Sequence, residues 1–161
     1  MPTPRDWESV EKAKRASVGQ LLLKGARLLD ERALARINRQ GPKVTLRPAH
    51  TSLLPHIDQQ GTRLTELARR LGVTKQAAGQ LVSDLESMRL LERVDDEADG
   101  RAKLVRFTRA GVEAIGHGLS VLRGIEDELE QALGKARMRQ LHEALLTVVD
   151  ELSRPDPETG A

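Results

Sequence analysis

The sequence contains no cysteine and no tyrosine, and it has one tryptophan and one phenylalanine among 161 residues. Without cysteine the chain has no disulfide bonds, no thiolate ligands for a metal and no cysteine-based redox sensor. Because aromatic residues are so rare, we expect the hydrophobic core to be built from Leu, Ile, Val and Ala.

Long hydrophobic runs are also missing. No stretch approaches the roughly 20 consecutive apolar residues that a transmembrane helix needs, and the first residues lack the apolar run of a signal peptide. These features predict a cytoplasmic protein with no membrane partner. Charged residues make up 31% of the chain but the formal net charge is only +2, so the positions of the cations matter more than their number.

The patterns that support catalysis are absent as well. We find no nucleophile beside a base, no paired carboxylates, no metal cluster and no phosphate loop. His50 and His56 are six residues apart, which places them on different faces of a helix, and the other histidines lack acidic ligands at metal-binding spacing. We therefore predict that the protein is not an enzyme and has no catalytic residue, no metal and no cofactor.

Apolar residues at helical spacing predict a mainly α-helical fold. The first helix is long and is expected to bend near Gly25, and Gly41-Pro42 ends it. Gly72 separates two helices that must cross steeply, and Gly134 separates the last two. The expected helices cover residues 7–37, a short segment from Pro48, 62–70, 74–88, 108–133 and 135–152.

A single β-hairpin interrupts these helices. Its predicted strands are Leu91–Val94 and Lys103–Phe107, joined by a polar, glycine-containing loop at residues 95–102. The acidic run Asp95–Glu97 in this loop would repel phosphate if it faced a nucleic acid, so we expect a solvated shoulder that points away.

The helix that begins at Thr74 has a face suited to reading DNA. Gln76 and Gln80 are four residues apart on one side, and a glutamine amide can pair with adenine, while Lys75 can reach guanine or a phosphate. The alternative is an ordinary solvated face of a packed helix. The predicted DNA-binding residues of this helix are Thr74, Lys75, Gln76, Ala77, Gly79, Gln80 and Ser83.

The hairpin directly after this helix favours the DNA-binding interpretation. A cation at its tip can enter the minor groove, and Arg101 stands where such a cation is needed. Asp99, two residues earlier, can hold the Arg101 guanidinium in a fixed orientation. The predicted contacts of this hairpin are Arg93, Asp99, Arg101 and Lys103.

Several motifs resemble the multiple-antibiotic-resistance regulator (MarR) family. They are LTELARRLGVTKQAA at 64–78, LVSDLE at 81–86, LLER at 90–93, DGR at 99–101 and FTRAG at 107–111. The resemblance implies one domain at 7–153, in which a winged helix-turn-helix lobe (46–111) is flanked by dimerisation helices (7–40 and 112–153). It also implies repression relieved by a small ligand.

Arg89 occupies a position that commonly holds glycine in such proteins, so we expect a differently shaped helix end. Residues 154–161 contain two prolines and are expected to be a disordered tail.

The terminal helices carry apolar stripes that the lobe is too small to cover, so we expect a homodimer that binds an inverted repeat in double-stranded DNA. Their packing onto their own lobe is the alternative. A pocket for a small-molecule effector is expected at Arg47, His50 and His56, which are otherwise surface or packing residues. The competing functions are a winged-helix protein–protein interaction module without specific DNA binding, and a DNA-binding activator or architectural protein.

Overall fold

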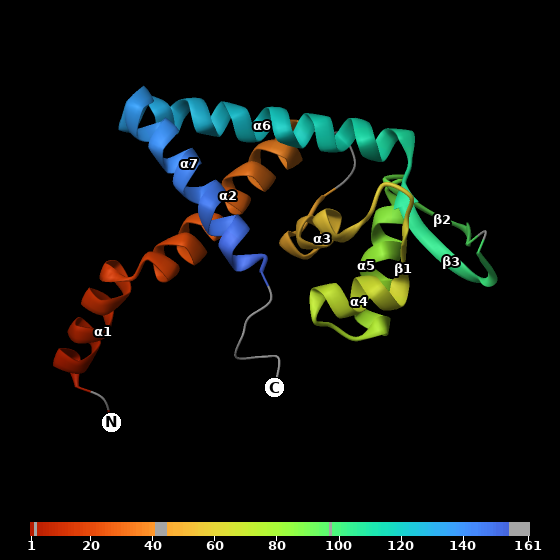
Figure 1. The fold of residues 1–161 in the computed structure, drawn as a ribbon, viewed down its shortest axis with the longest axis horizontal. Helices are drawn as coiled ribbons and strands as arrows, with labels where there is room; N and C mark the ends of the chain where they lie inside the picture. Colours follow the sequence, from red (N-terminus) through yellow and green to blue (C-terminus); the bar gives the residue numbers. More distant parts are fainter. Residues whose placement is uncertain (2, 41–44, 97, 155–161) are drawn as a thin grey trace. The chain divides into compact units, whose positions relative to one another are not determined.

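The computed structural model describes residues 1, 3–40, 45–96 and 98–154, apart from the side chains of Gln40 and Arg101. The predicted helix end at Gly41-Pro42 lies outside these ranges. Of the predicted tail at 154–161, residues 155–161 lie outside them as well, whereas Arg154 is described. The chain divides into two units, residues 1–121 and 122–161, and one helix runs across the division (Figure 1). Helices and a small antiparallel sheet make up the fold, as the sequence predicts.

The first unit begins with two helices in place of the single one predicted. Helix α1 spans Pro4–Ala16 and α2 spans Val18–Gln40. The break lies at Ser17, where the backbone is extended, and α2 continues through Gly25 without interruption. The reason is capping, because the Ser17 hydroxyl accepts a hydrogen bond from the Gln20 amide (3.3 Å) and so begins α2.

A helical lobe follows. Helix α3 spans Pro48–Leu53 and continues into a 3₁₀ turn, Leu54–His56. Helices α4, Leu64–Leu71, and α5, Lys75–Ser87, form the helix-turn-helix. Gly72 ends α4 in the left-handed conformation (φ 65°), which glycine adopts without steric cost. Thr74 caps α5, since its hydroxyl accepts from the Ala77 amide at 3.1 Å.

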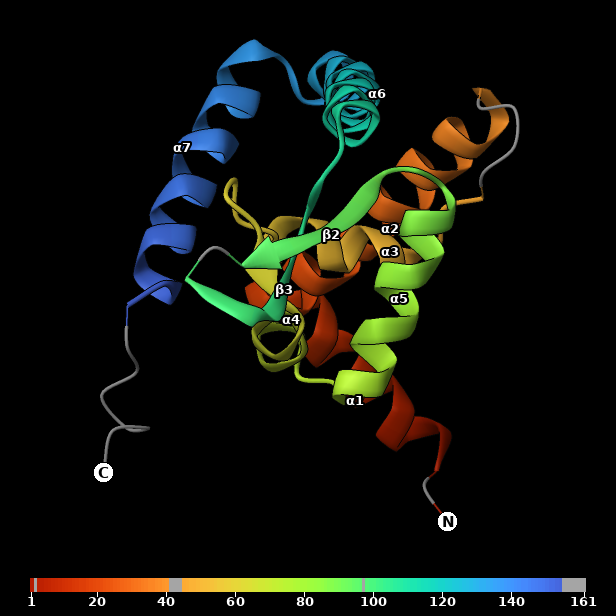
Figure 2. The same cartoon turned by 90° about the vertical axis from the view of Figure 1, so that its right-hand side faces the viewer.

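The sheet has three strands in place of the two predicted. Strand β1, Thr62–Arg63, pairs with β3, Asp99–Phe107, which in turn pairs with β2, Leu91–Asp96. The order is β1-β3-β2 and all pairs are antiparallel. Both hairpin strands extend into the predicted loop, because pairing continues to Asp96 and Asp99 through a register shift. Figure 2 shows this hairpin beside α5.

The core of the lobe is aliphatic, as the lack of aromatic residues predicts. It gathers residues from α3 to β3 that are each less than a tenth exposed. Packing of these side chains holds α5 against the sheet and leaves the opposite face of α5 exposed. The core residues are Leu53, Ile57, Leu67, Val82, Leu85, Leu91 and Val105.

Arg89 forms the corner between α5 and β2. It is the one non-glycine residue with positive φ (60°) among those that the structure describes. The Leu90 amide donates to the Leu85 carbonyl (2.9 Å) and the Arg89 amide to the Glu86 carbonyl (2.8 Å), which is the Schellman pattern of helix ends. The expectation of a different helix end is therefore wrong, because Arg89 adopts the conformation that favours glycine.

Helix α6, Arg109–Leu133, begins in the first unit and ends in the second. The Thr108 hydroxyl caps it by accepting from the Gly111 amide (2.9 Å), as predicted. In the second unit, Gly134 (φ 82°) separates α6 from α7, Lys135–Leu152, which confirms the predicted break. Within the described ranges, no helix combines the length and hydropathy needed to cross a membrane.

Candidate nucleic-acid interface

Helix α5 has a buried face and a polar face. Ala78, Val82 and Leu85 are completely buried on one side. The other side presents the predicted recognition residues, of which Gly79 is half-buried and the rest are exposed. The exposed residues are Thr74, Lys75, Gln76, Ala77, Gln80 and Ser83. The chain thus offers a helix surface with hydrogen-bonding groups and a cation, which base edges and phosphates require.

Lys75 differs from the other cations near this face. In the part of the chain that the structure describes, its ammonium group has no hydrogen bond or ion pair. A surface hollow lies beside it, lined by residues of α4, α5 and the sheet. These residues are Arg63, Leu64, Thr65, Lys75, Arg93, Ala102, Lys103 and Val105. Four of the eight are cations, and three of these, Arg63, Arg93 and Lys103, pair with acidic side chains. Lys75 is the cation of this hollow that remains available to an anionic group.

Two predicted DNA-binding residues of the β2–β3 hairpin, Arg93 and Lys103, are held by internal ion pairs. Arg93 contacts Glu86 at 2.6 Å and the Ser83 hydroxyl at 3.3 Å, which ties β2 to α5. Lys103 pairs with Asp95 across the hairpin. The side chain of Arg101 lies outside the described residues, so its orientation by Asp99 stays a prediction. The Asp99 carboxylate lies 3.5 Å from the Arg63 guanidinium.

One residue of the acidic run departs from the solvated shoulder that we expected. Asp95 is exposed, as expected, and Glu97 lies outside the described residues. Asp96 is only 7% exposed and accepts two hydrogen bonds from the Arg63 guanidinium, at 2.6 and 2.8 Å. These bonds hold the pKa of Asp96 below its ordinary value. Arg63 and Asp96 therefore join β1 to the end of β2, and the hairpin is held by a paired charge.

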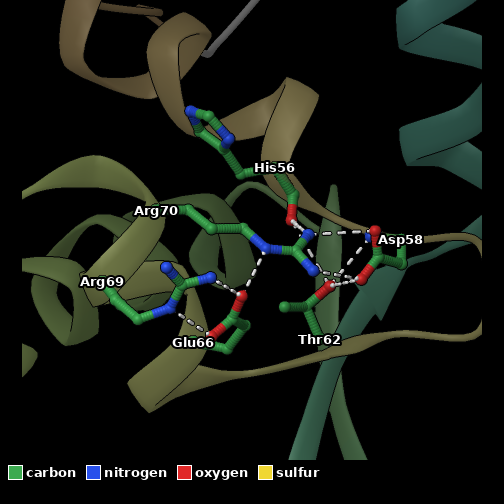
Figure 3. Close-up of polar contacts among 6 residues, drawn as sticks. All are labelled: His56, Asp58, Thr62, Glu66, Arg69 and Arg70. Atoms are coloured by element: carbon green, nitrogen blue, oxygen red, sulfur yellow. Dashed lines mark hydrogen bonds and ion pairs between the residues drawn. The ribbon is translucent and has the colours of Figure 1, made fainter. Parts of the chain in front are cut away.

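A second ion-pair network braces α4. The Arg70 guanidinium lies between Asp58 (2.9 Å) and Glu66 (2.8 Å), and it also donates to the His56 carbonyl at 2.8 Å (Figure 3). Arg69 adds a further bond to Glu66 (2.6 Å). Hydrogen bonds from Arg69 and Arg70 lower the pKa of Glu66 to about 2. The network joins α4 to the segment before β1.

The predicted pocket residues separate into two places. Arg47 and His50 converge on Asp84 of α5, and His50 is buried, with its Nε2 atom 3.3 Å from the carboxylate. His56 contributes its carbonyl oxygen to Arg70, while its ring points away from that guanidinium (Figure 3). The structure thus brings Arg47 and His50 together at α5 and places His56 elsewhere.

Three residues whose ion pairs brace the candidate interface were not predicted from the sequence: Asp84, Arg63 and Arg70. Asp84 is one helical turn after Gln80, and this spacing was a usable signal for a side-chain contact. Arg63 and Asp96 are 33 residues apart, so no local pattern indicates their pairing. In the described portion of the chain, no three His, Asp or Glu residues cluster as metal ligands would.

A helix-turn-helix followed by a β-hairpin that packs beside it defines a winged-helix protein. Residues 44–102 match the sequence model described as the MarR family. This match covers the helix-turn-helix and most of the hairpin, and it confirms the resemblance predicted from the sequence. A search of curated proteins finds no match.

Solved structures share this fold over most of the chain. A transcriptional regulator of Thermotoga maritima, Tm0710, has a TM-score of 0.64 at 25% identity, and the match covers 84% of this chain and 94% of the Tm0710 chain. RV1404 of Mycobacterium tuberculosis has a TM-score of 0.68 at 23% identity, with 87% and 95% covered. Apo MarR of Escherichia coli has a TM-score of 0.67 at 19% identity, with 82% and 96% covered.

Proposed function

We propose that the protein is a sequence-specific regulator of transcription that binds double-stranded DNA, without catalytic activity, in the cytoplasm. The observation that carries this proposal is the polar face of α5, with Lys75 unpaired among the described residues and Gln76 and Gln80 exposed. In this arrangement α5 enters the major groove, and Arg101 reaches the adjacent minor groove. The MarR-family winged helix supports the assignment.

The protein is proposed to act as a homodimer formed by its terminal helices. Neither α1 nor α7 buries a single residue in the isolated chain. Exposed apolar side chains on helices of this length are a strong reason for association. They include Trp7, Val10, Leu141, Leu145, Leu146 and Val149. Residues 7–153 would then form one domain, and the two lobes would meet an inverted repeat whose half-sites are about one helical turn apart.

Repression relieved by a small ligand is the last part of the proposal. Arg47 and His50 contact Asp84 directly, so a ligand that engages them acts on α5 through a single carboxylate. Such a ligand shifts the protein between states only by its different affinity for each of them. His56 would complete the predicted pocket.

The proposal is tested by a gel shift with genomic fragments, followed by footprinting of the retained fragment. We expect a protected inverted repeat, and an affinity that falls by about a thousandfold between 50 and 200 mM salt, for roughly six to ten phosphate contacts. Light scattering should give twice the chain mass of 17.8 kDa. If no fragment is retained at low salt while a protein co-purifies, the protein–protein interaction module is the better assignment.

A further inference from the structure

One of the two exposed glutamines of α5 is held in place and the other is not. The Gln80 side-chain nitrogen donates a hydrogen bond of 2.8 Å to Oδ1 of Asp84, one turn further along the helix. Gln76 has no such bond to any residue in the described ranges. The two side chains thus belong to the same surface but differ in freedom of rotation.

The bond to Asp84 also determines which way the Gln80 amide faces. An ionised carboxylate only accepts hydrogen bonds, so the amide nitrogen and not its oxygen must face Asp84. The amide has two N–H groups, and one of them remains after this bond forms. Gln80 therefore keeps one donor and its carbonyl acceptor, the pair that a bidentate contact with adenine requires.

Asp84 is itself held from a second helix. Its Oδ2 atom receives the Arg47 guanidinium and lies 3.3 Å from Nε2 of His50, while Oδ1 receives Gln80. The His50 ring is 1% exposed, and its Nδ1 atom accepts the Arg47 backbone N–H at 3.2 Å. Nε2 also lies 3.1 Å from Nη2 of Arg47, so Arg47, His50 and Asp84 contact one another at one point. With both oxygens occupied, the carboxylate has one orientation.

We propose that Asp84 is a positioning residue for base recognition, which fixes the amide of Gln80 before DNA is bound and ties its orientation to α3. The inference rests on the proposed function and adds a specificity determinant that does not itself need to touch DNA. Preorganisation of this kind reduces the conformational entropy that a long polar side chain loses on binding.

The test is Asp84→Asn in the full-length protein, with Asp127→Asn as a control that makes the same change in charge at an exposed residue of α6. Competition binding measures the preference at every base pair of the operator. Gln80→Ala first identifies the pair that Gln80 reads. At that pair we expect Asp84→Asn to lower the preference about fivefold to tenfold, within the range for one bidentate contact. The preference at the other base pairs should be unchanged, and so should the whole profile of Asp127→Asn.

The double variant Gln80→Ala/Asp84→Asn separates positioning from a general structural role. If Asp84 acts through Gln80, the second substitution adds no further loss at that base pair. Three results would each overturn the inference. Asp84→Asn could weaken binding equally whichever base pair is changed, or it could leave the base preference unchanged at every pair. Gln80→Ala could alter the preference at no base pair. Absence of any base preference in the wild type would instead remove the proposed function.

A measurement on the unmodified protein does not depend on DNA or on the folding of a variant. In ¹⁵N relaxation of the side-chain amides, Gln80 should behave as a rigid group and Gln76 as a mobile one on the ps–ns timescale. Equal mobility of the two amides would show that Asp84 does not hold Gln80, and the inference would be abandoned.

Discussion

The carbonyl oxygen of Leu90 occupies the space beside Gly111 so closely that a Cβ atom on Gly111 would lie 2.0 Å from it. The Thr108 amide donates to this same oxygen at 3.1 Å, and the Thr108 hydroxyl donates to the Arg89 carbonyl at 2.6 Å. The end of α5 and the start of α6 are therefore joined by backbone groups that leave no room for a side chain.

Gly111→Ala should destabilise the protein severely, by about 3 kcal/mol or more, because the added methyl group forces backbone atoms apart. Urea unfolding measures the change. Gly116→Ala is the matched control in the same helix, where a Cβ meets nothing within 4 Å. It should raise the free energy of unfolding by roughly 0.5–1 kcal/mol through helix propensity. Similar effects of the two substitutions would contradict the close approach.

Arg89→Gly should stabilise the protein by roughly 0.5–1 kcal/mol. A residue with a Cβ atom loses about 1–2 kcal/mol in the left-handed conformation, and the greater freedom of glycine in the unfolded chain offsets part of the gain. This prediction is based on the φ of 60° at Arg89. Arg89→Ala keeps the Cβ atom and should give no such increase in urea unfolding. A stabilising alanine would point to the arginine charge as the cause.

Acid should weaken the bracing of α4. The pKa of Glu66 is about 2 in the folded protein, against an ordinary value of 4.5, and Arg70 also lowers the pKa of Asp58. The stabilisation from Glu66 is therefore complete above about pH 4.5 and is lost as the pH falls towards 2. Arg70→Met should reduce the loss of stability between pH 5 and 3 in urea unfolding.

Arg137→Met serves as the control for this pH dependence, since Arg137 has no ion pair within the described ranges. It removes one positive charge from α7 without touching the network of Figure 3. If both variants lost stability with acid equally, the slope would come from overall charge rather than from the Arg70 ion pairs.

Lys75→Ala should weaken binding to all DNA sequences by a similar factor. A lysine that contacts phosphate contributes about one released counterion, so the slope of log K against log salt should fall by about one per subunit. Lys12→Ala removes a lysine from α1, outside the proposed DNA-binding face, and should leave the salt dependence of DNA binding unchanged. A Lys75→Ala effect confined to certain base pairs would mean that this lysine reads a base.

Local patterns were enough to predict most helices and the helix-turn-helix. The Thr74 and Thr108 caps and the break at Gly134 act within three or four residues, so their geometry is encoded next to the helix they begin or end. The break at Ser17 was missed because a glycine was ranked above a capping hydroxyl.

The sequence by itself determined the helical periodicity, the helix-turn-helix and the apolar terminal helices, because each depends on residues within a few helical turns. Only the tertiary structure decided that β1 pairs with β3, that Arg63 holds Asp96, and that His50 and Arg47 fix Asp84 behind Gln80. These partners are more than 30 residues apart, and the collapse of the aliphatic core brings them together.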